Sequence, residues 1–269
     1  ILKELIQLRQ ELHKHPEVSG NESKTAKRIL DFLTKYTPTE IITNLGGYGI
    51  LVIYKGKEDG KSVLFRCELD ALPIQEINLF DYKSLYEGVS HKCGHDGHMA
   101  ILCGMAKTLH ENPLEKGTVM LLFQPAEEDG NGAKRVLNDS NFDAIKPDFA
   151  FALHNLPSYK KHQIVIKENT FTCAANSMII QLNGKTSHAG EPENGINPSL
   201  AIAEIIQVFN SNINTDVSSI NYCLITPIHI NMGEKAYGVS AGYGEVHFTV
   251  RSNSNAQMRI IESNLEENV

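Results

Sequence analysis

The sequence predicts an α/β protein with two domains. The chain of 269 residues is long enough to bury two hydrophobic cores. In its first part, apolar runs of strand length alternate with helical patterns, which is typical of a layered α/β sheet. After about residue 169 the order becomes β-α-β-β-α, the pattern of a ferredoxin-like split βαβ unit without its last strand. We therefore expect one domain over residues 1–168 and a second, incomplete one over 169–269.

Two helices and then two strands open the first domain. Apolar residues at helical spacing predict helices within residues 2–12 and 26–33. Apolar runs over 49–54 and 62–69, each next to a glycine-rich turn, predict strands.

Helices and strands alternate through the rest of the first domain. A helical pattern over 99–109 precedes Thr118–Gln124, a continuous apolar run of the kind that a strand buried on both faces needs. A helix around 133–137 and a strand over 148–154 follow.

The second domain is predicted from five segments in a fixed order. Residues 176–184 are expected to form a strand, 197–213 a helix, and 221–230 and 244–252 two further strands. A last helix is expected to begin near Asn255.

The composition excludes several classes of protein. A net charge of −7 without a basic stripe disfavours a nucleic-acid partner, and no apolar run is long enough for a membrane span. The N-terminal segment has no apolar signal-peptide core, and five cysteines argue against a disulfide framework. We therefore expect a cytoplasmic protein. Four cysteines are expected to be small buried apolar side chains: Cys67, Cys103, Cys173 and Cys223.

The segment VSHKCGHDGHMA concentrates groups that bind metals. Cys93, His95 and His98 lie close together, and two glycines between them allow tight turns. This cluster has no ordinary packing role. Thiolate and imidazole, together with carboxylates, form a donor set that zinc or manganese accepts. The segment therefore predicts a divalent metal site.

Three more polar segments follow predicted strands: ELDALP from Glu68, QPAEE from Gln124, and LHN from Leu153. Ligands of open α/β sheets bind outside the carboxyl ends of the strands, so these loops are expected to converge. The two acids of QPAEE come directly after a buried strand, where a carboxylate without a partner is costly. We therefore interpret them as site residues.

Five ordered motifs together resemble a known family. They are ELDALPIQE, HKCGHDGHMA, LLFQPAEEDGNGA, ALHNLP and NGKTSHAGEPENGINP, and they span nearly the whole chain. They look like the metal-dependent N-acyl-amino-acid amidohydrolases. This family is related to aminoacylase and metallo-carboxypeptidases, and it includes hippurate hydrolase, indole-acetyl-amino-acid hydrolases and N-acetyl-diaminopimelate deacetylase.

The resemblance implies a role for each matching position. Glu127 matches the general acid/base, and Asp70 matches an active-site acid behind the metals, where it orients ligands. His188 matches a histidine that reaches substrate, in relatives often across a dimer interface, and is expected to donate to the oxyanion. Asn155 is expected to bind substrate as well. The implied metal ligands are Cys93, His95, Glu128 and His154.

The resemblance also implies a fold and a mechanism. The family fold is a mixed-sheet catalytic domain covered by helices on both faces, with an inserted ferredoxin-like lid used for dimerisation. Two divalent ions, manganese or zinc, are expected to polarise a water and the amide carbonyl of an N-acyl amino acid or peptide-like substrate, while Glu127 moves the proton. A homodimer is expected. The rest of the catalytic domain, with a last histidine ligand, is expected beyond Val269.

Two departures from the family pattern bear on the alternatives. Glu68 stands where relatives usually have aspartate, and Gly238 stands where they commonly have an asparagine that contacts substrate. A dipeptidase or carboxypeptidase of the same group is disfavoured, because such relatives tend to have histidine at the position of Glu68. An inactive relative that binds N-acyl amino acids or a protein partner is also disfavoured, since a binding module needs no general base beside a metal site.

Overall fold

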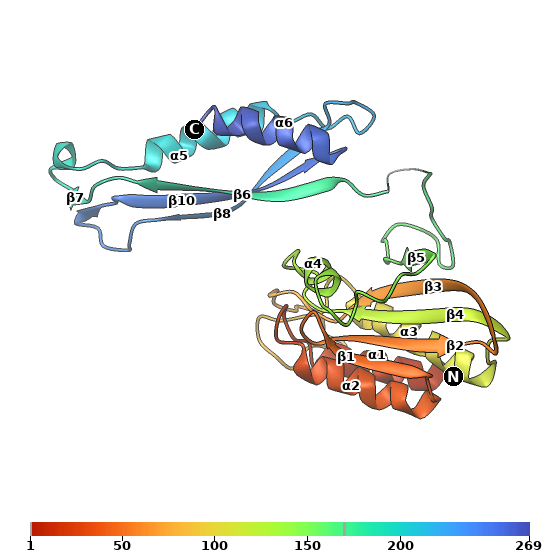
Figure 1. Cartoon of the computed structure of the whole chain (residues 1–269). Helices are drawn as coiled ribbons and strands as arrows, with labels where there is room; N and C mark the ends of the chain where they lie inside the picture. Colours follow the sequence, from red (N-terminus) through yellow and green to blue (C-terminus); the bar gives the residue numbers. More distant parts are fainter. Residues whose placement is uncertain (1, 169–170) are drawn as a thin grey trace. The chain divides into compact units, whose positions relative to one another are not determined.

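The computed structural model describes residues 2–168 and 171–269, and the chain divides into two compact units (Figure 1). The units comprise Ile1–Tyr159 and Lys160–Val269. The boundary expected after residue 168 adjoins residues 169 and 170, which lie outside the described part of the chain. Among the described residues, no helix is both long and apolar enough to cross a bilayer.

The N-terminal unit contains a five-stranded sheet and its covering helices. The sheet order is β1-β2-β4-β3-β5. β2 pairs antiparallel with both β1 and β4, whereas β3 pairs parallel with both β4 and β5, so the sheet is mixed. The strands are β1 (Glu40–Leu45), β2 (Gly49–Lys55), β3 (Glu58–Glu68), β4 (Lys116–Gln124) and β5 (Phe149–Ala152). The helices are α1 (Leu2–Lys14), α2 (Ser23–Leu33), η1 (Thr34–Tyr36), α3 (His95–Glu111) and α4 (Gly132–Leu137).

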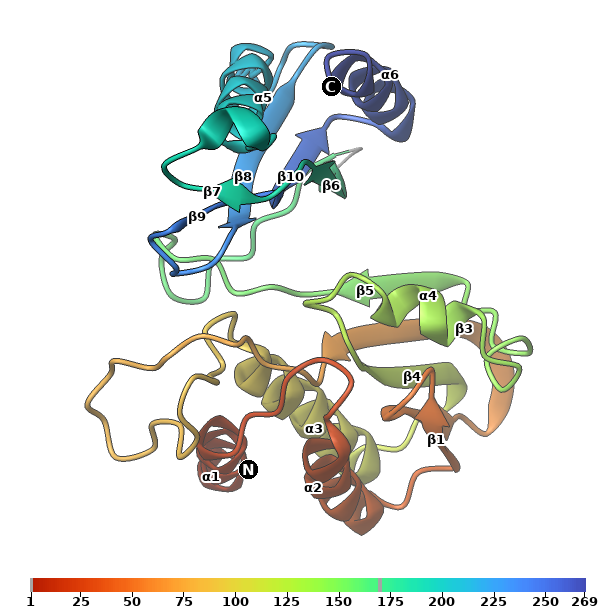
Figure 2. The ribbon, with the colours of Figure 1, turned by 90° about the vertical axis from the view of Figure 1, so that its left-hand side faces the viewer.

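Alternation along the central strands gives the sheet two apolar faces. Ile50 and Val52 of β2 join the larger core, which contains buried side chains of α1, α2 and α3. The intervening Leu51 and Ile53 face the other way and pack in a second cluster with Val136 of α4. Helices therefore lie on both faces of the sheet, as Figure 2 shows.

One strand of this unit was missed by the sequence pattern. β1 lies at the edge of the sheet, and of its residues only Leu45 is fully buried. Its segment EIITNL therefore lacks the apolar run that marks β2 and β4. The other predicted helices and strands of the unit are confirmed.

The five longest elements of the C-terminal unit follow the predicted β-α-β-β-α order, whereas two further strands of two residues each were not predicted. Its three-stranded antiparallel sheet has the order β6-β10-β8. One core fills the space between the sheet and the two helices, with Phe209 and Val246 fully buried in it. The elements are β6 (Ala174–Asn183), α5 (Ser199–Ser211), β8 (Cys223–Met232), β10 (Tyr243–Ser252) and α6 (Asn255–Glu266), with the short β7 (Ser187–His188), η2 (Pro192–Asn194) and β9 (Val239–Ser240).

The cysteine prediction was right for three side chains and wrong for one. Cys67, Cys103 and Cys223 are buried, whereas Cys173 is exposed. Cys173 lies just before β6, at the edge of the sheet and outside the core between sheet and helices. Its position in the chain gave no sign of this, because a single cysteine carries no periodicity.

Candidate metal centre

The three polar segments follow three neighbouring strands and lie at the same edge of the sheet. Glu68 ends β3, Gln124 ends β4 and Ala152 ends β5. Because β3 runs parallel to both of its neighbours, these carboxyl ends point the same way. The segments that begin with Glu68, Pro125 and Leu153 are thereby brought together, as the sequence predicted.

The turn into α3 depends on a glycine. Gly94 precedes the helix with a φ of 94°, in the left-handed region that glycine adopts without steric cost. A Cβ at this position would collide with the side chain of Asn155. The turn places Cys93 and His95 on either side of Gly94, and the Cys93 Sγ lies 3.2 Å from Nε2 of His154.

His95 is oriented with one nitrogen facing the site. Its Nδ1 lies 2.8 Å from the carbonyl oxygen of Asp70, which accepts a hydrogen bond from it. The other nitrogen, Nε2, lies 3.7 Å from a carboxylate oxygen of Glu127 and 3.8 Å from one of Glu128. Its lone pair is therefore directed toward two acids.

The residues present fit a divalent cation. His95 Nε2, Glu128 Oε1 and Asp70 Oδ1 are buried and have no hydrogen-bond partner in the part of the chain that the structure describes. Possible ligand atoms lie within 4.8 Å of one another in three groups, and His95 belongs to all three. The groups are Cys93, His95 and His154; Glu68, His95 and His98; and His95, Glu127 and Glu128. Thiolate, imidazole and carboxylate donors at this spacing suit zinc or a similar ion.

The electrostatics also favour a cation. Burial raises the pKa of the Cys93 thiol to about 12, and the carboxylates of Glu128 and Glu127 add to the rise. Burial likewise raises the pKa of Glu128, and Glu127 contributes to that shift against the opposing effect of His95. The Cys93 thiol and the carboxyls of Glu127 and Glu128 therefore lie close enough to disfavour one another's negative charge. A divalent ion between them would stabilise the thiolate and the carboxylates.

Asp70 supports the site from behind. It is fully buried, and its Oδ2 accepts hydrogen bonds from the Ser19 hydroxyl at 2.7 Å and from the backbone N–H of Glu128 at 2.9 Å. Because the Asp70 carbonyl also accepts a hydrogen bond from the ring of His95, Asp70 contacts two of the predicted ligands, His95 and Glu128. This geometry suits an orienting role.

His98 and Glu68 form a buried pair that the sequence did not predict, although His98 was counted in the metal-binding cluster. His98 Nδ1 lies 2.8 Å from Glu68 Oε2, and Nε2 lies 2.7 Å from the side-chain oxygen of Asn155. Burial by itself would raise the pKa of Glu68, but the hydrogen bond with His98 and the charge of Arg66 hold it below its ordinary value. The cost of an unpaired carboxylate at the end of a buried strand was the signal that could have revealed this pair.

Asn155 links this pair to a predicted ligand. Its backbone oxygen accepts a hydrogen bond from Nδ1 of His154 at 2.7 Å, which leaves Nε2 of His154 free to face Cys93. The side chain of Asn155 is directed at His98. The contacts of Asn155 thus fix the orientation of His154, in addition to the substrate role predicted for it.

His188 lies in the C-terminal unit. It is exposed in the short strand β7, where its Nδ1 accepts a hydrogen bond from the N–H of Gly190 at 3.0 Å. Gly238 lies next to it, because the N–H of Ala189 donates to the Gly238 carbonyl at 2.9 Å. The two positions that the sequence analysis linked to substrate in this unit are therefore neighbours.

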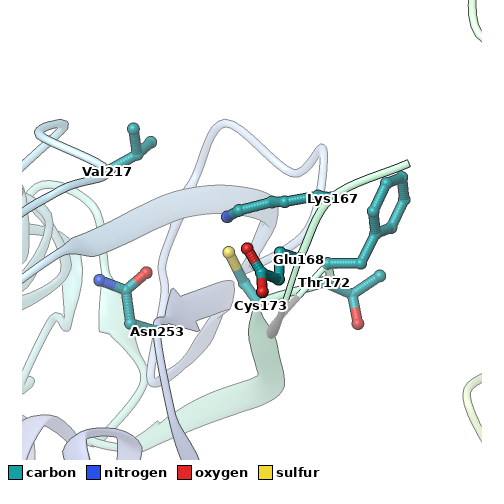
Figure 3. A pocket seen from close by; sticks show the side chains of 7 residues that line it. Lys167, Glu168, Thr172, Cys173, Val217 and Asn253 are labelled. Carbon is teal, nitrogen blue, oxygen red and sulfur yellow. The ribbon is translucent and has the colours of Figure 1, made fainter. Parts of the chain in front are cut away.

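The C-terminal unit also has a hollow of about 310 Å³ (Figure 3). Lys167, Glu168, Cys173 and Asn253 are among the side chains that line it. None of the predicted site residues lines this hollow, which is therefore separate from the candidate metal centre.

Comparison with known proteins agrees with the geometry. Residues 64–267 match the model of "Peptidase family M20/M25/M40". The chain is 34% identical to an N-acetylcysteine deacetylase of Bacillus subtilis over 249 residues, which covers 92% of this chain and 65% of that protein. It is 32% identical to an N-acetyldiaminopimelate deacetylase of Listeria innocua over 267 residues, covering 99% of this chain and 71% of that protein.

Solved structures show the same fold. One is a dinuclear metal binding peptidase of the M20 family from Bacillus subtilis, with a TM-score of 0.73 and 28% identity over 98% of this chain and 67% of that one. Another, from methicillin-resistant Staphylococcus aureus and designated an aminohydrolase, has a TM-score of 0.80 and 27% identity over 98% of this chain and 70% of that one. The family expected from the five motifs is confirmed, and this chain belongs to peptidase family M20/M25/M40.

Proposed function

We propose that the protein hydrolyses the amide bond of N-acyl amino acids with two divalent metal ions, zinc or manganese. The observation that carries the proposal is Nε2 of His95, which has no hydrogen-bond partner among the described residues and faces the carboxylates of both Glu127 and Glu128. An imidazole and two adjacent acids at the end of a buried strand have a clear use in metal-assisted hydrolysis and none in packing.

The metal ligands in this proposal are Cys93, His95, Glu128 and His154. When bound, the ions supply Lewis acidity, which activates water and polarises the carbonyl of the scissile amide. Asp70 holds the Glu128 backbone and the His95 ring, so these two ligands keep their orientation.

Glu127 is the proposed general base and acid. Its side chain is 38% exposed, compared with 18% for Glu128, so it is the more accessible of the two carboxylates. Glu127 takes a proton from the attacking water and returns it to the nitrogen of the leaving amine. The more buried Glu128, held through its backbone N–H by Asp70, is the better placed of the two to serve as a fixed ligand.

The C-terminal unit is proposed to act as a lid and dimerisation domain. Exposed His188 would then contact substrate and donate a hydrogen bond to the developing oxyanion. The two named relatives are deacetylases of N-acetylcysteine and N-acetyldiaminopimelate, so N-acetyl amino acids are the first substrates to test.

The test is amine release from N-acetyl amino acids by the zinc- or manganese-loaded chain. We expect turnover by the wild type and loss of at least a hundredfold in Glu127→Gln, with metal content unchanged, because general acid–base catalysis contributes roughly 10²–10⁴-fold. Glu115→Gln is the matched control, since this glutamate is 77% exposed and its side chain pairs with Lys57. Metal-loaded wild type without turnover, or Glu127→Gln with full turnover, would refute the proposal.

A further inference from the structure

A short connector between α1 and α2, residues 17–22, touches two of the turns that form the site. The hydroxyl of Ser19 donates to Asp70, and the Glu17 carbonyl accepts from the N–H of Ala71 at 2.8 Å. Glu22 reaches a different turn: its Oε1 accepts a hydrogen bond from the N–H of Gly20 within the connector at 2.9 Å and one from the N–H of Ala126 at 2.8 Å. The connector thus contacts the segments after both β3 and β4.

Glu22 is an unusual residue to find at this place. It is fully buried, and within the described residues its Oε2 has no hydrogen-bond partner. It occupies the N-cap position of α2 without making a side-chain capping bond there. Glu17 performs that task, because its Oε2 accepts from the backbone N–H of Thr25 at 2.7 Å and from the Thr25 hydroxyl at 2.9 Å. Since a buried carboxylate is costly, the contacts of Glu22 require another explanation.

The partner of Glu22 has a strained backbone. Ala126 is fully buried and has a φ of 50°, in the left-handed region that residues with a Cβ adopt rarely. Both of its polar groups are held, the N–H by Glu22 and the carbonyl by the N–H of Gly132 at 2.8 Å. Such a conformation persists only when surrounding contacts enforce it.

The conformation of Ala126 determines where the next two residues go. Glu127 and Glu128 follow directly, and both carboxylates lie within 4 Å of His95 Nε2. If Ala126 relaxed to an ordinary φ, the chain after it would turn in another direction.

We propose that Glu22 is a positioning residue, which holds the turn at Ala126 so that Glu127 and Glu128 face His95. Glu22 acts through the backbone of Ala126 and touches neither metal ligand nor substrate. Its effect on metal affinity rests on the proposed function, whereas its effect on the turn does not.

Four variants of the full chain separate this role from general stability. Glu22→Ala removes the carboxylate oxygen that accepts the hydrogen bond from the Ala126 N–H. Glu22→Asp keeps the negative charge but shortens the side chain by one methylene, so that its oxygen lies farther from Ala126. Glu22→Gln keeps an acceptor oxygen at the same side-chain length. Glu17→Ala is the matched control, because it removes a carboxylate of the same connector that caps α2 and does not contact Ala126. The Asp variant serves if the Ala variant does not fold.

Two readouts are needed: amide hydrogen exchange of Ala126 in the metal-free chain, and the dissociation constant for Zn²⁺. In Glu22→Ala and Glu22→Asp we expect exchange at Ala126 to accelerate at least tenfold and zinc affinity to fall about tenfold or more, as for other residues that support metal ligands. Glu22→Gln should restore most of both values. Glu17→Ala should accelerate exchange at Thr25 and leave zinc affinity unchanged.

Unchanged exchange at Ala126 in both Glu22→Ala and Glu22→Asp would overturn the inference. So would a loss of zinc affinity in Glu17→Ala equal to that in Glu22→Ala, since the effect would then be one of general stability. Failure of the wild type to bind zinc would refute the proposed function, and exchange at Ala126 would still decide whether Glu22 holds the turn.

Discussion

Replacing Gly94 by alanine should destabilise the N-terminal unit by about 2–3 kcal/mol. The φ of 94° at this position costs a residue with a Cβ about 1–2 kcal/mol. The new methyl group would also displace the side chain of Asn155 from His98, and a lost hydrogen bond of this kind is worth about 1 kcal/mol. Because Asn155 orients His154, the same variant should bind zinc more weakly.

The free energy of unfolding can be measured by urea titration, with hydrogen exchange of peptides from residues 2–159 reporting this unit alone. Gly97→Ala is the matched control in the first turn of the same helix. Gly97 does not have a positive φ, and a Cβ there would meet nothing within 4 Å in the described chain. This control should be neutral or more stable by up to about 1 kcal/mol, because alanine favours helix. Equal free energies of unfolding for the two variants would refute the reasoning about Gly94.

Two further predictions concern acid stability and thiol reactivity. Burial would raise the pKa of Glu76, but hydrogen bonds from Lys92, the Ser84 N–H and His13 lower it from 4.5 to about 2. The folded state should therefore lose this stabilisation as the pH falls from about 4.5 to 2. The urea midpoint of unfolding should fall less steeply over that pH range in Glu76→Gln than in the wild type, and an equal slope would contradict this prediction. In the native protein a thiol reagent should label exposed Cys173 whether or not zinc is present. Half-buried Cys93, whose pKa is raised to about 12, should be labelled slowly without zinc and more slowly still with it. Peptide mass spectrometry distinguishes the two cysteines, and labelling of Cys93 at an undiminished rate in excess zinc would argue against its role as a ligand.

The sequence predicted the elements that are strongly periodic or strongly apolar. β4 is an example, since a strand buried on both faces needs the continuous run that it carries. β1 was missed because an edge strand needs few apolar residues. The order of elements in the C-terminal unit was predictable for a different reason: each element buries one face in a shared core, which leaves a periodic apolar pattern in the sequence.

The candidate metal ligands could be predicted from the sequence, whereas the residues that hold those ligands in position could not. Cys93 and His95 stand out because several metal-binding groups are close together in the chain. The pairing of Glu68 with His98 joins β3 to α3, and the hydrogen bond from Ala126 to Glu22 spans more than a hundred residues. Such contacts depend on tertiary geometry: a carboxylate at the end of a buried strand indicates that it needs a partner, but neither residue type nor local spacing identifies that partner. The roles assigned to the site residues remain predictions.

The most direct test of the account is the zinc content of the dialysed wild-type chain compared with that of His95→Ala. His95 belongs to each of the three groups of possible ligands, so its loss affects every one of them. We predict that the wild type retains zinc and that the variant loses most of it while keeping its secondary structure by circular dichroism. Equal zinc in the two proteins, or none in the wild type, would contradict the assignment of a metal centre to these residues.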